Sequence, residues 1–226
     1  MATTDPRRTG IASGFFLGAM TYAQLVAGYA ASSFSGWMVR VTDVGANGCY
    51  MVSNGTRWQQ LQGQAILKGL GAAVSGIANS ETIVLQTLLP ANVWQVNDTI
   101  RVWLNVTKSG TTTDSLACRI RAGTAGTTAD TAIYSSSGAN LLATSNQSGG
   151  FIFDFKLASA TSSQRVGDAA TNQAGSYTAA VSTAAAAAVT ITDASANALY
   201  ISVSIFSSGV AETVAIQSGQ IQHITP

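Results

Sequence analysis

The segment Thr99–Thr107, TIRVWLNVT, decides the fold class of this chain. Successive side chains of a β-strand point to opposite faces. One face of this segment is therefore apolar and holds Ile100, Val102, Leu104 and Val106. The opposite face holds Arg101, Trp103 and Asn105. The alternation predicts a strand that turns one face into a core and the other away from it.

Similar alternation recurs throughout residues 76–226, with glycine and Ser/Thr clusters between the segments. The expected strands cover residues 82–88, 99–107, 116–121, 151–157, 199–205 and 213–221, with weaker ones at 132–135, 163–166 and 189–192. We see no helical run of convincing length. An all-β chain follows, whose residues 76–226 form an antiparallel, jelly-roll-like β-sandwich.

A second alternating stretch is Gly36–Leu67, GWMVRVTDVGANGCYMVSNGTRWQQLQGQAIL. It predicts a small β-meander of three strands, with Ala65–Leu67 as a candidate fourth. Asn54-Gly55 is a strong hairpin signal, because a type I′ turn needs positive φ at both central residues. The glycine-rich residues 68–80 indicate a linker, so we place a domain of meander and linker at residues 36–75.

Residues 41–67 resemble a short module of tail-fibre and related virion proteins of tailed bacteriophages. In that family the module links a virion-docking N-terminus to a distal domain. The matching residues are Asp43, Val44, Gly45, Gly48, Tyr50, Ser53, Asn54, Gly55, Thr56, Arg57, Trp58 and Gly63. The later segments Leu89–Val102 and Arg119–Thr124 also resemble parts of the jelly-roll-like domains at phage fibre and spike tips. The resemblance implies a structural module and names no activity.

The N-terminal residues 11–34 carry no charge and follow the pair Arg7-Arg8. We consider three explanations for this uncharged segment: a membrane span, a secretory signal, or a segment that buries apolar side chains against a partner protein. Interspersed glycines, serines and a glutamine favour the third explanation, and the resemblance implies that this part docks to the particle. We therefore expect a short extended docking segment at residues 1–35. The side chains expected to dock are Phe15, Phe16, Met20, Tyr22, Leu25, Val26 and Tyr29.

The charge and cysteine content restrict the partners. Charged residues make up 9% of the 226 residues, against about 25% in ordinary soluble domains. Such a surface suits a chain packed against other copies or other proteins. A net charge of +1 predicts no nucleic-acid partner.

Cys49 and Cys118 lack metal-site spacing and the chain has one histidine, so we expect neither a metal nor a cofactor. Whether the cysteines form a disulfide is left open.

Catalytic patterns are weak. The single histidine, His223, is close to the end of the sequence, and no G-x-S-x-G elbow precedes a helix. A glycosidase needs two carboxylates about 5 to 9.5 Å apart. Asp130, Asp154 and Asp168 are the carboxylates to inspect, although turn or surface roles are expected for each. Residues 123–130 offer one carboxylate, too few for calcium.

Ligand binding is the remaining role for the β-sandwich. Trp103 alternates with Arg101 on the face opposite the predicted core, and Trp94 precedes them in a loop. Indole rings can stack on sugar rings, so these three residues are the expected ligand-binding set. The competing explanation is an aromatic residue in a subunit interface.

Together these features predict a non-enzymatic phage virion structural protein, a short tail fibre or spike. Its N-terminus would attach to tail, portal-proximal or capsid proteins, and its β-domain would bind a glycan or protein of the host surface. The resemblance implies a homotrimer, and the absence of heptads excludes a coiled coil as its basis. The alternatives are a head or tail decoration protein without a receptor and a secreted carbohydrate-binding module. A polysaccharide-degrading enzyme is third.

Overall fold

The computed structural model describes residues 16–44, 48–60, 64–69, 80–109, 116–135, 147–172, 187–207 and 213–225. The chain divides into two compact units, residues 1–65 with 224–226, and residues 66–223. The division falls at residue 65, whereas the boundary expected near residue 75 lies outside the described residues. None of the helices in the described part has the length and apolar character needed to cross a bilayer.

The N-terminal unit is built on a four-stranded sheet with the order β1-β2-β3-β4. Its strands are β1 (Phe16–Met20), β2 (Met38–Val41), β3 (Cys49–Ser53) and β4 (Trp58–Gln60). β1 is parallel to β2, and the other pairs are antiparallel. The meander predicted for residues 36–61 is therefore present, but β1 extends it. The described residues 16–35 belong to the same compact unit as the meander.

A helix interrupts the segment that was predicted to be extended. α1 spans Tyr22–Gly28 and is followed by the short 3₁₀ helix η1 (Ala31–Ser33). The Thr21 side chain accepts a hydrogen bond from the Gln24 amide, and the Gln24 side chain accepts one from the Thr21 amide. This capping box satisfies two amide groups at the start of the helix. Together with the apolar pair Tyr22 and Leu25, it explains why a helix forms here.

The hairpin between β3 and β4 also differs from the predicted turn. Gly55 has a φ of 86°, but Asn54 is not among the residues with positive φ, so the turn is not type I′. Four residues separate the paired Ser53 and Trp58. The Asn54 side-chain oxygen accepts hydrogen bonds from the amides of Thr56 and Arg57, at 2.9 Å each, which stabilises the longer loop.

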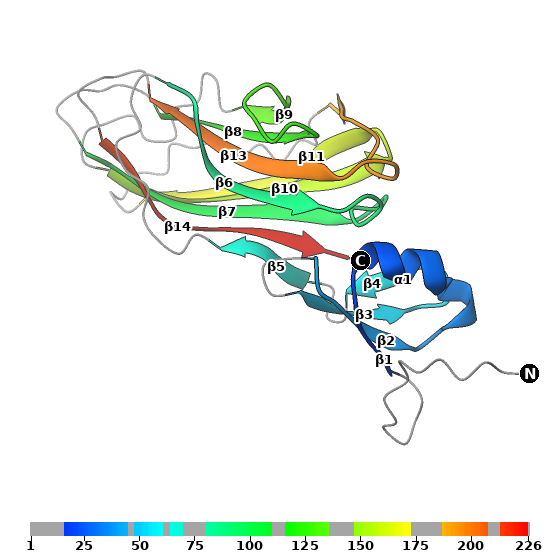
Figure 1. Cartoon of the computed structure of the whole chain (residues 1–226). Coiled ribbons are helices and arrows are strands. Elements are labelled where there is room, and N and C mark those ends of the chain that lie inside the picture. The colour runs from blue at the N-terminus through cyan, green and yellow to red at the C-terminus, as the bar shows by residue number, and fades with distance from the viewer. Residues whose placement is uncertain are drawn as a thin grey trace, which may run out of the picture. The chain divides into compact units, whose positions relative to one another are not determined.

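The C-terminal unit is an antiparallel, jelly-roll-like β-sandwich, as predicted. One sheet has the order β6-β13-β8-β9, and the other has the order β12-β11-β10-β7-β14-β5. Figure 1 shows the two sheets as stacked layers. The strands are β5 (Gln64–Gly69), β6 (Thr82–Leu89), β7 (Thr99–Ser109), β8 (Leu116–Gly123), β9 (Thr131–Ser135), β10 (Gln147–Ser159), β11 (Ser162–Asn172), β12 (Val189–Thr190), β13 (Leu199–Ser207) and β14 (Thr213–Ile224).

The predicted alternation is confirmed in the core between the sheets. Buried side chains from the six-stranded sheet include Ile100, Val102, Leu104, Phe151, Phe153 and Phe155, and those from the four-stranded sheet include Cys118, Ile120, Ile201, Val203 and Ile205. The ring of Tyr134 in β9 lies 4.6 Å from that of Phe153 in β10, so the two sheets meet through their aromatic residues. β5 does not join the meander, because it pairs with β14 in the larger sheet.

Candidate functional site

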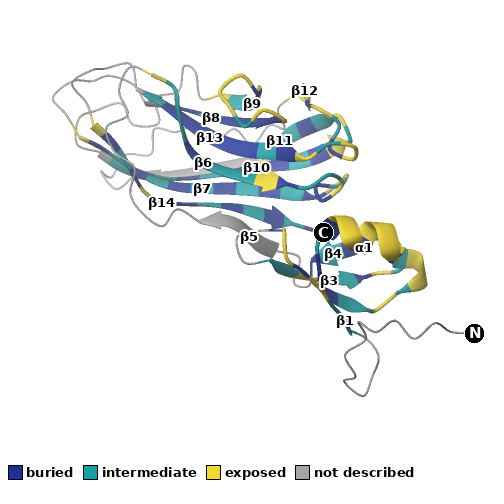
Figure 2. Cartoon of the chain, in the orientation of Figure 1, coloured by how far each residue is buried: buried dark blue, intermediate teal, exposed yellow. Residues whose placement is uncertain are grey.

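The candidate site lies on the face of β7 that points away from the sandwich core. β7 is an interior strand, between β10 and β14. Its residues alternate between buried and half-buried along almost its whole length, as Figure 2 shows. Arg101, Trp103 and Asn105 occupy the half-buried positions, as predicted. A position on an interior strand fixes these side chains on a rigid surface.

Arg101 forms a two-pronged ion pair with Asp154 on the neighbouring strand. The register places Asp154 of β10 directly opposite Arg101. Arg101 Nε donates to Asp154 Oδ1 and Nη2 donates to Oδ2, both at 2.8 Å. The side chains are 40% and 20% exposed. The hydrogen bonds to Asp154 raise the pKa of the Arg101 guanidinium above its ordinary value. The pair therefore holds both side chains in a fixed, electrically neutral arrangement.

Trp103 is the large aromatic residue of this face. Ile152 of β10 lies opposite Trp103, and Gly150 lies opposite Asn105 and contributes no side chain to the face. Within the described part of the chain, neither the Trp103 indole nor the Asn105 amide has a hydrogen-bond partner. The same holds for Nη1 of Arg101. We call Arg101, Trp103, Asn105, Ile152 and Asp154 the Trp103 face.

Trp94, the third residue of the predicted ligand-binding set, does not belong to this face. Its side chain is buried, with 2% of its surface exposed, and its indole nitrogen donates to the backbone oxygen of Asp98 at 3.2 Å. Trp94 therefore packs the turn before β7 and is unavailable to a ligand. The expectation failed because residues in a turn carry no alternation that would assign them to a face.

His223 is more deeply placed than its position near the end of the sequence suggested. It lies in β14, and its Nε2 atom is 3.0 Å from Oδ2 of Asp98. Its Nδ1 atom is buried and has no hydrogen-bond partner in the described residues. The signal in the sequence was the spacing from Ile221, since residues two apart on a strand share a face. No nucleophile or oxyanion donor accompanies the pair among the described contacts.

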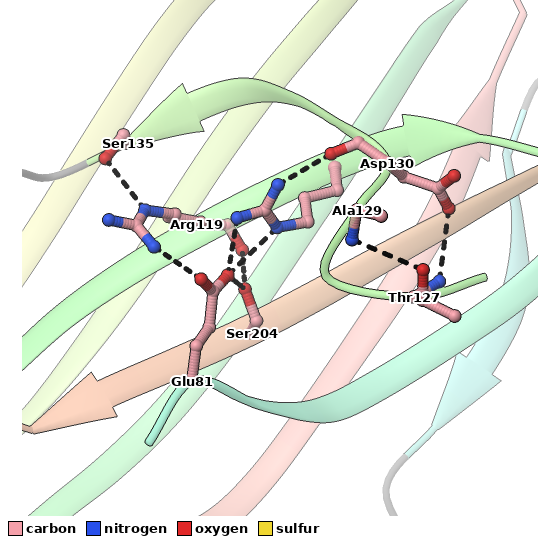
Figure 3. A network of polar contacts seen from close by, with 8 residues as sticks. Glu81, Arg119, Thr127, Ala129, Asp130, Ser135 and Ser204 are labelled. Carbon is pink, nitrogen blue, oxygen red and sulfur yellow. Dashed lines mark hydrogen bonds and ion pairs between the residues drawn. The ribbon is translucent and has the colours of Figure 1, made fainter. Parts of the chain in front are cut away.

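A second polar cluster lies on the outer face of the four-stranded sheet (Figure 3). Glu81, just before β6, contacts Arg119 and accepts hydrogen bonds from Arg121 at 2.7 and 2.9 Å and from Ser204 at 2.6 Å. Burial raises the pKa of the Glu81 carboxyl, but the hydrogen bonds from Ser204, Arg121 and Arg119 outweigh it and lower the pKa overall. These contacts tie the start of β6 to β8 and β13, so the cluster stabilises the fold.

Two of the three carboxylates singled out for catalysis, Asp130 just before β9 and Asp154 in β10, belong to different sheets of the sandwich. Asp130 accepts hydrogen bonds from the backbone amides of Ala125, Gly126 and Thr127, and so holds the loop between β8 and β9. Asp154 is bound to Arg101 in the other sheet. The side chain of Asp168 lies outside the described residues. No three His, Cys, Asp or Glu side chains converge anywhere in the described ranges.

The module residues hold the N-terminal unit together. Asp43 Oδ1 accepts a hydrogen bond from the Tyr22 amide at 2.7 Å. The Trp58 indole donates to the Tyr29 carbonyl at 2.9 Å, and the Ser53 hydroxyl donates to the Ala31 carbonyl at 2.7 Å. Gly48 has a φ of 71°. Gly45 lies outside the described residues, and Asn54, Gly55 and Arg57 form the β3–β4 loop described above.

The predicted docking residues are mostly core residues of this unit. Met20, Tyr22, Leu25 and Tyr29 are buried by the chain itself, which corrects the expectation that they present a free surface. Capping of α1 and the pairing of β1 with β2 turn them inward. Val26 is exposed, Phe16 is half-buried and Phe15 is outside the described residues. The ring of Phe16 lies 6.3 Å from Tyr50, which is 51% exposed.

Cys49 and Cys118 are both thiols, on β3 of the N-terminal unit and β8 of the C-terminal unit. Burial raises the pKa of Cys49 to about 11, with a further contribution from the charge of Asp43. Burial likewise raises the pKa of Cys118 to about 12, with a contribution from Glu81. Both groups are therefore poor nucleophiles at neutral pH.

Comparison with known proteins adds little to this geometry. No protein-family model matches the chain, and no curated protein is similar to it. Among solved structures, the chain is similar to peanut lectin with a nine-residue peptide, at 12% identity and a TM-score of 0.35. That match covers 72% of this chain and 99% of the lectin chain. The fold assignment rests on the strand order and core described above.

Proposed function

We propose that this chain is a non-enzymatic structural protein of a tailed-phage particle, a short tail fibre or spike. Its N-terminal unit attaches to other virion proteins, and its β-sandwich is displayed and binds the host surface. The observation that carries the proposal is the block Ser53–Trp58, SNGTRW, together with Asp43 and Gly48. The same residues that resemble the phage module make the contacts that hold the N-terminal unit together.

The burial of Met20, Tyr22, Leu25 and Tyr29 changes where attachment is proposed. In the sheet of the N-terminal unit, Val39 and Val41 are buried on one face. Phe16 and Tyr50 lie on the opposite face, since their partners Met38 and Arg40 alternate with the two valines. That opposite face carries exposed aromatic surface, so we assign it the docking role first expected of the buried residues.

Host binding is proposed for the β-sandwich of the C-terminal unit. The Trp103 face combines a half-buried indole with a fixed Arg101–Asp154 pair on an interior strand. Aromatic residues and arginine recur where proteins recognise partners, because they provide both contact area and directed hydrogen bonds. A host-surface molecule is the partner that a displayed domain of a particle meets.

The test is whether the chain is part of the particle. Antibodies raised against residues 80–226 are applied to gradient-purified virions of the phage that encodes the chain, and bound gold is located by electron microscopy. The proposal expects label at a fixed position on intact particles. A chain that is abundant in the lysate but absent from purified particles would contradict the proposal.

A further inference from the structure

We propose that the Trp103 face binds an uncharged sugar unit of a bacterial surface polysaccharide. This inference rests on the proposed function, because it names the ligand class of the host-binding domain. The ring of the sugar lies against the indole of Trp103, and its hydroxyl groups bond to Arg101, Asn105 and Asp154.

Trp103 is held at a fixed position on the outward face of an interior strand. Its neighbours along β7, Val102 and Leu104, are buried in the core, and β10 and β14 pair with the strand on either side. The indole is thus held on the outer surface by a backbone that has little freedom to move. A fixed aromatic surface binds a flat apolar ring face with a small entropy cost. The indole N–H, which has no partner in the described residues, remains available to an oxygen.

Hydrogen-bond donors and acceptors are both present around the Trp103 ring. Sugar hydroxyls donate and accept, so their site needs both kinds of group. Arg101 Nη1 and the Asn105 amide supply donors that are unused in the described part of the chain. Asp154 uses each carboxylate oxygen once, for Arg101, and a carboxylate oxygen can accept a further bond. Gly150, opposite Asn105, adds no side chain that would cover these groups.

The charges of the Trp103 face balance, which favours an uncharged ligand. The charges of Arg101 and Asp154 neutralise each other at 2.8 Å. The next cation on β10 is Lys156, which is paired with Thr99. Thr99 is four positions from Trp103, which is about 13 Å along a strand, beyond the screening length of about 8 Å at physiological ionic strength. An anionic ligand therefore has little to attract it to Trp103.

A protein partner fits the face less well. The cores of stable protein interfaces are apolar and rich in aromatic residues. Across the outward positions of β7 and β10, the large apolar side chains are Trp103 and Ile152 alone. The other outward positions hold Thr99, Arg101, Asn105, Thr107, Ser109, Ser148, Gly150, Asp154, Lys156 and Ala158. One aromatic ring within a polar surround favours a small polar ligand.

The experiment uses the full chain and an array of purified bacterial surface polysaccharides with neutral and acidic repeat units. Trp103→Ala and Trp103→Phe are compared with wild type, and Leu88→Ala is the matched control, because it removes a large exposed apolar side chain from the other sheet of the same sandwich. We expect binding to neutral members, a loss of at least about tenfold in Trp103→Ala, and near wild-type binding in Trp103→Phe and Leu88→Ala. Binding should change little between low and high salt.

Several results would overturn the inference: no binding to any member, binding confined to acidic members, or undiminished binding by Trp103→Ala. A change in the native mass of Trp103→Ala would instead identify the face as a subunit interface, and the inference would again be wrong. The proposed function is tested separately. It would fail if the chain were absent from purified particles, whatever the result of the polysaccharide-binding experiment.

Discussion

His223 Nε2 lies 3.0 Å from Asp98 Oδ2, and the two side chains are 2% and 1% exposed. The contact joins the last strand, β14, to the turn that leads into β7. Asp98 Oδ2 also accepts a hydrogen bond from the Gln95 amide at 3.1 Å. A carboxylate removed from water in this way depends on its donors, so the pair is a tertiary contact on which the sandwich relies.

Replacing Asp98 should therefore destabilise the sandwich strongly. We expect Asp98→Ala to lower the free energy of unfolding by about 1–3 kcal/mol, because the buried Nε2 atom of His223 loses its hydrogen-bond partner. Asp98→Asn should cost less, since an amide oxygen can still accept. Denaturant unfolding measures both, and Asp193→Asn, in a surface loop, is the control expected to change little. Unfolding of Asp98→Ala at the wild-type midpoint would contradict the structural role.

The contribution of Glu81 should depend on pH. Its pKa is lower in the folded chain than in the unfolded chain, so the ionised carboxylate stabilises the fold at neutral pH. That stabilisation is fully present above the unfolded pKa and is lost as the pH falls through the folded pKa. At pH 7, Glu81→Gln should have a free energy of unfolding about 1–3 kcal/mol below that of wild type, measured by denaturant unfolding. This difference in free energy should shrink as the pH is lowered. A difference that is constant with pH would count against the ion-pair explanation.

Both cysteine thiols should resist modification in the native chain. At pH 8 a thiol with a pKa of about 11, for Cys49, or about 12, for Cys118, is almost entirely protonated. We expect a colorimetric disulfide reagent to label neither thiol in native buffer and both in denaturant. Rapid labelling of either thiol in native buffer would contradict the raised pKa of that thiol.

Gly48 should tolerate no side chain. It has a φ of 71°, and a Cβ atom there would lie 2.5 Å from the carbonyl oxygen of Val41. Gly48→Ala should destabilise the N-terminal unit by about 1–3 kcal/mol from backbone strain alone. Gly28→Ala is the control, because nothing lies within 4 Å of its Cβ position and alanine favours the helix. Thermal unfolding that is equal for the two variants would refute this assignment.

The proposed homotrimer predicts a native mass near three times 23.1 kDa. Light scattering after size exclusion measures it directly. A monomer would favour a decoration protein that assembles only on the particle, and attention would move to the face that carries Phe16 and Tyr50.

Alternation predicted the sandwich well because each strand has one face in the core. Ile100, Val102 and Leu104 are buried, and Arg101 and Trp103 are on the opposite face, as their spacing requires. The sequence could not predict that Arg101 pairs with Asp154. The two residues are opposite each other because β10 is the neighbour of β7, and the alternation within one strand does not identify its neighbour. Periodicity assigns a face, and the order of strands in the sheet assigns the contacts.

Two features were not predicted from the sequence: the helix α1 and the inward position of His223 in β14. Thr21 and Gln24 have the spacing of a capping box, which predicts the start of α1 better than hydrophobicity does. In β14 the buried positions shift by one between Ile216 and Gly219, so the face of His223 could be assigned only from Ile221.

The most direct measurement is competition for adsorption to the host bacterium. Purified wild-type chain is added in excess to host cells before the phage, and free phage is counted over time. The proposals predict that wild-type chain slows adsorption and that Trp103→Ala chain does not. Adsorption at an unchanged rate in the presence of wild-type chain would contradict the assignment of this protein to host attachment.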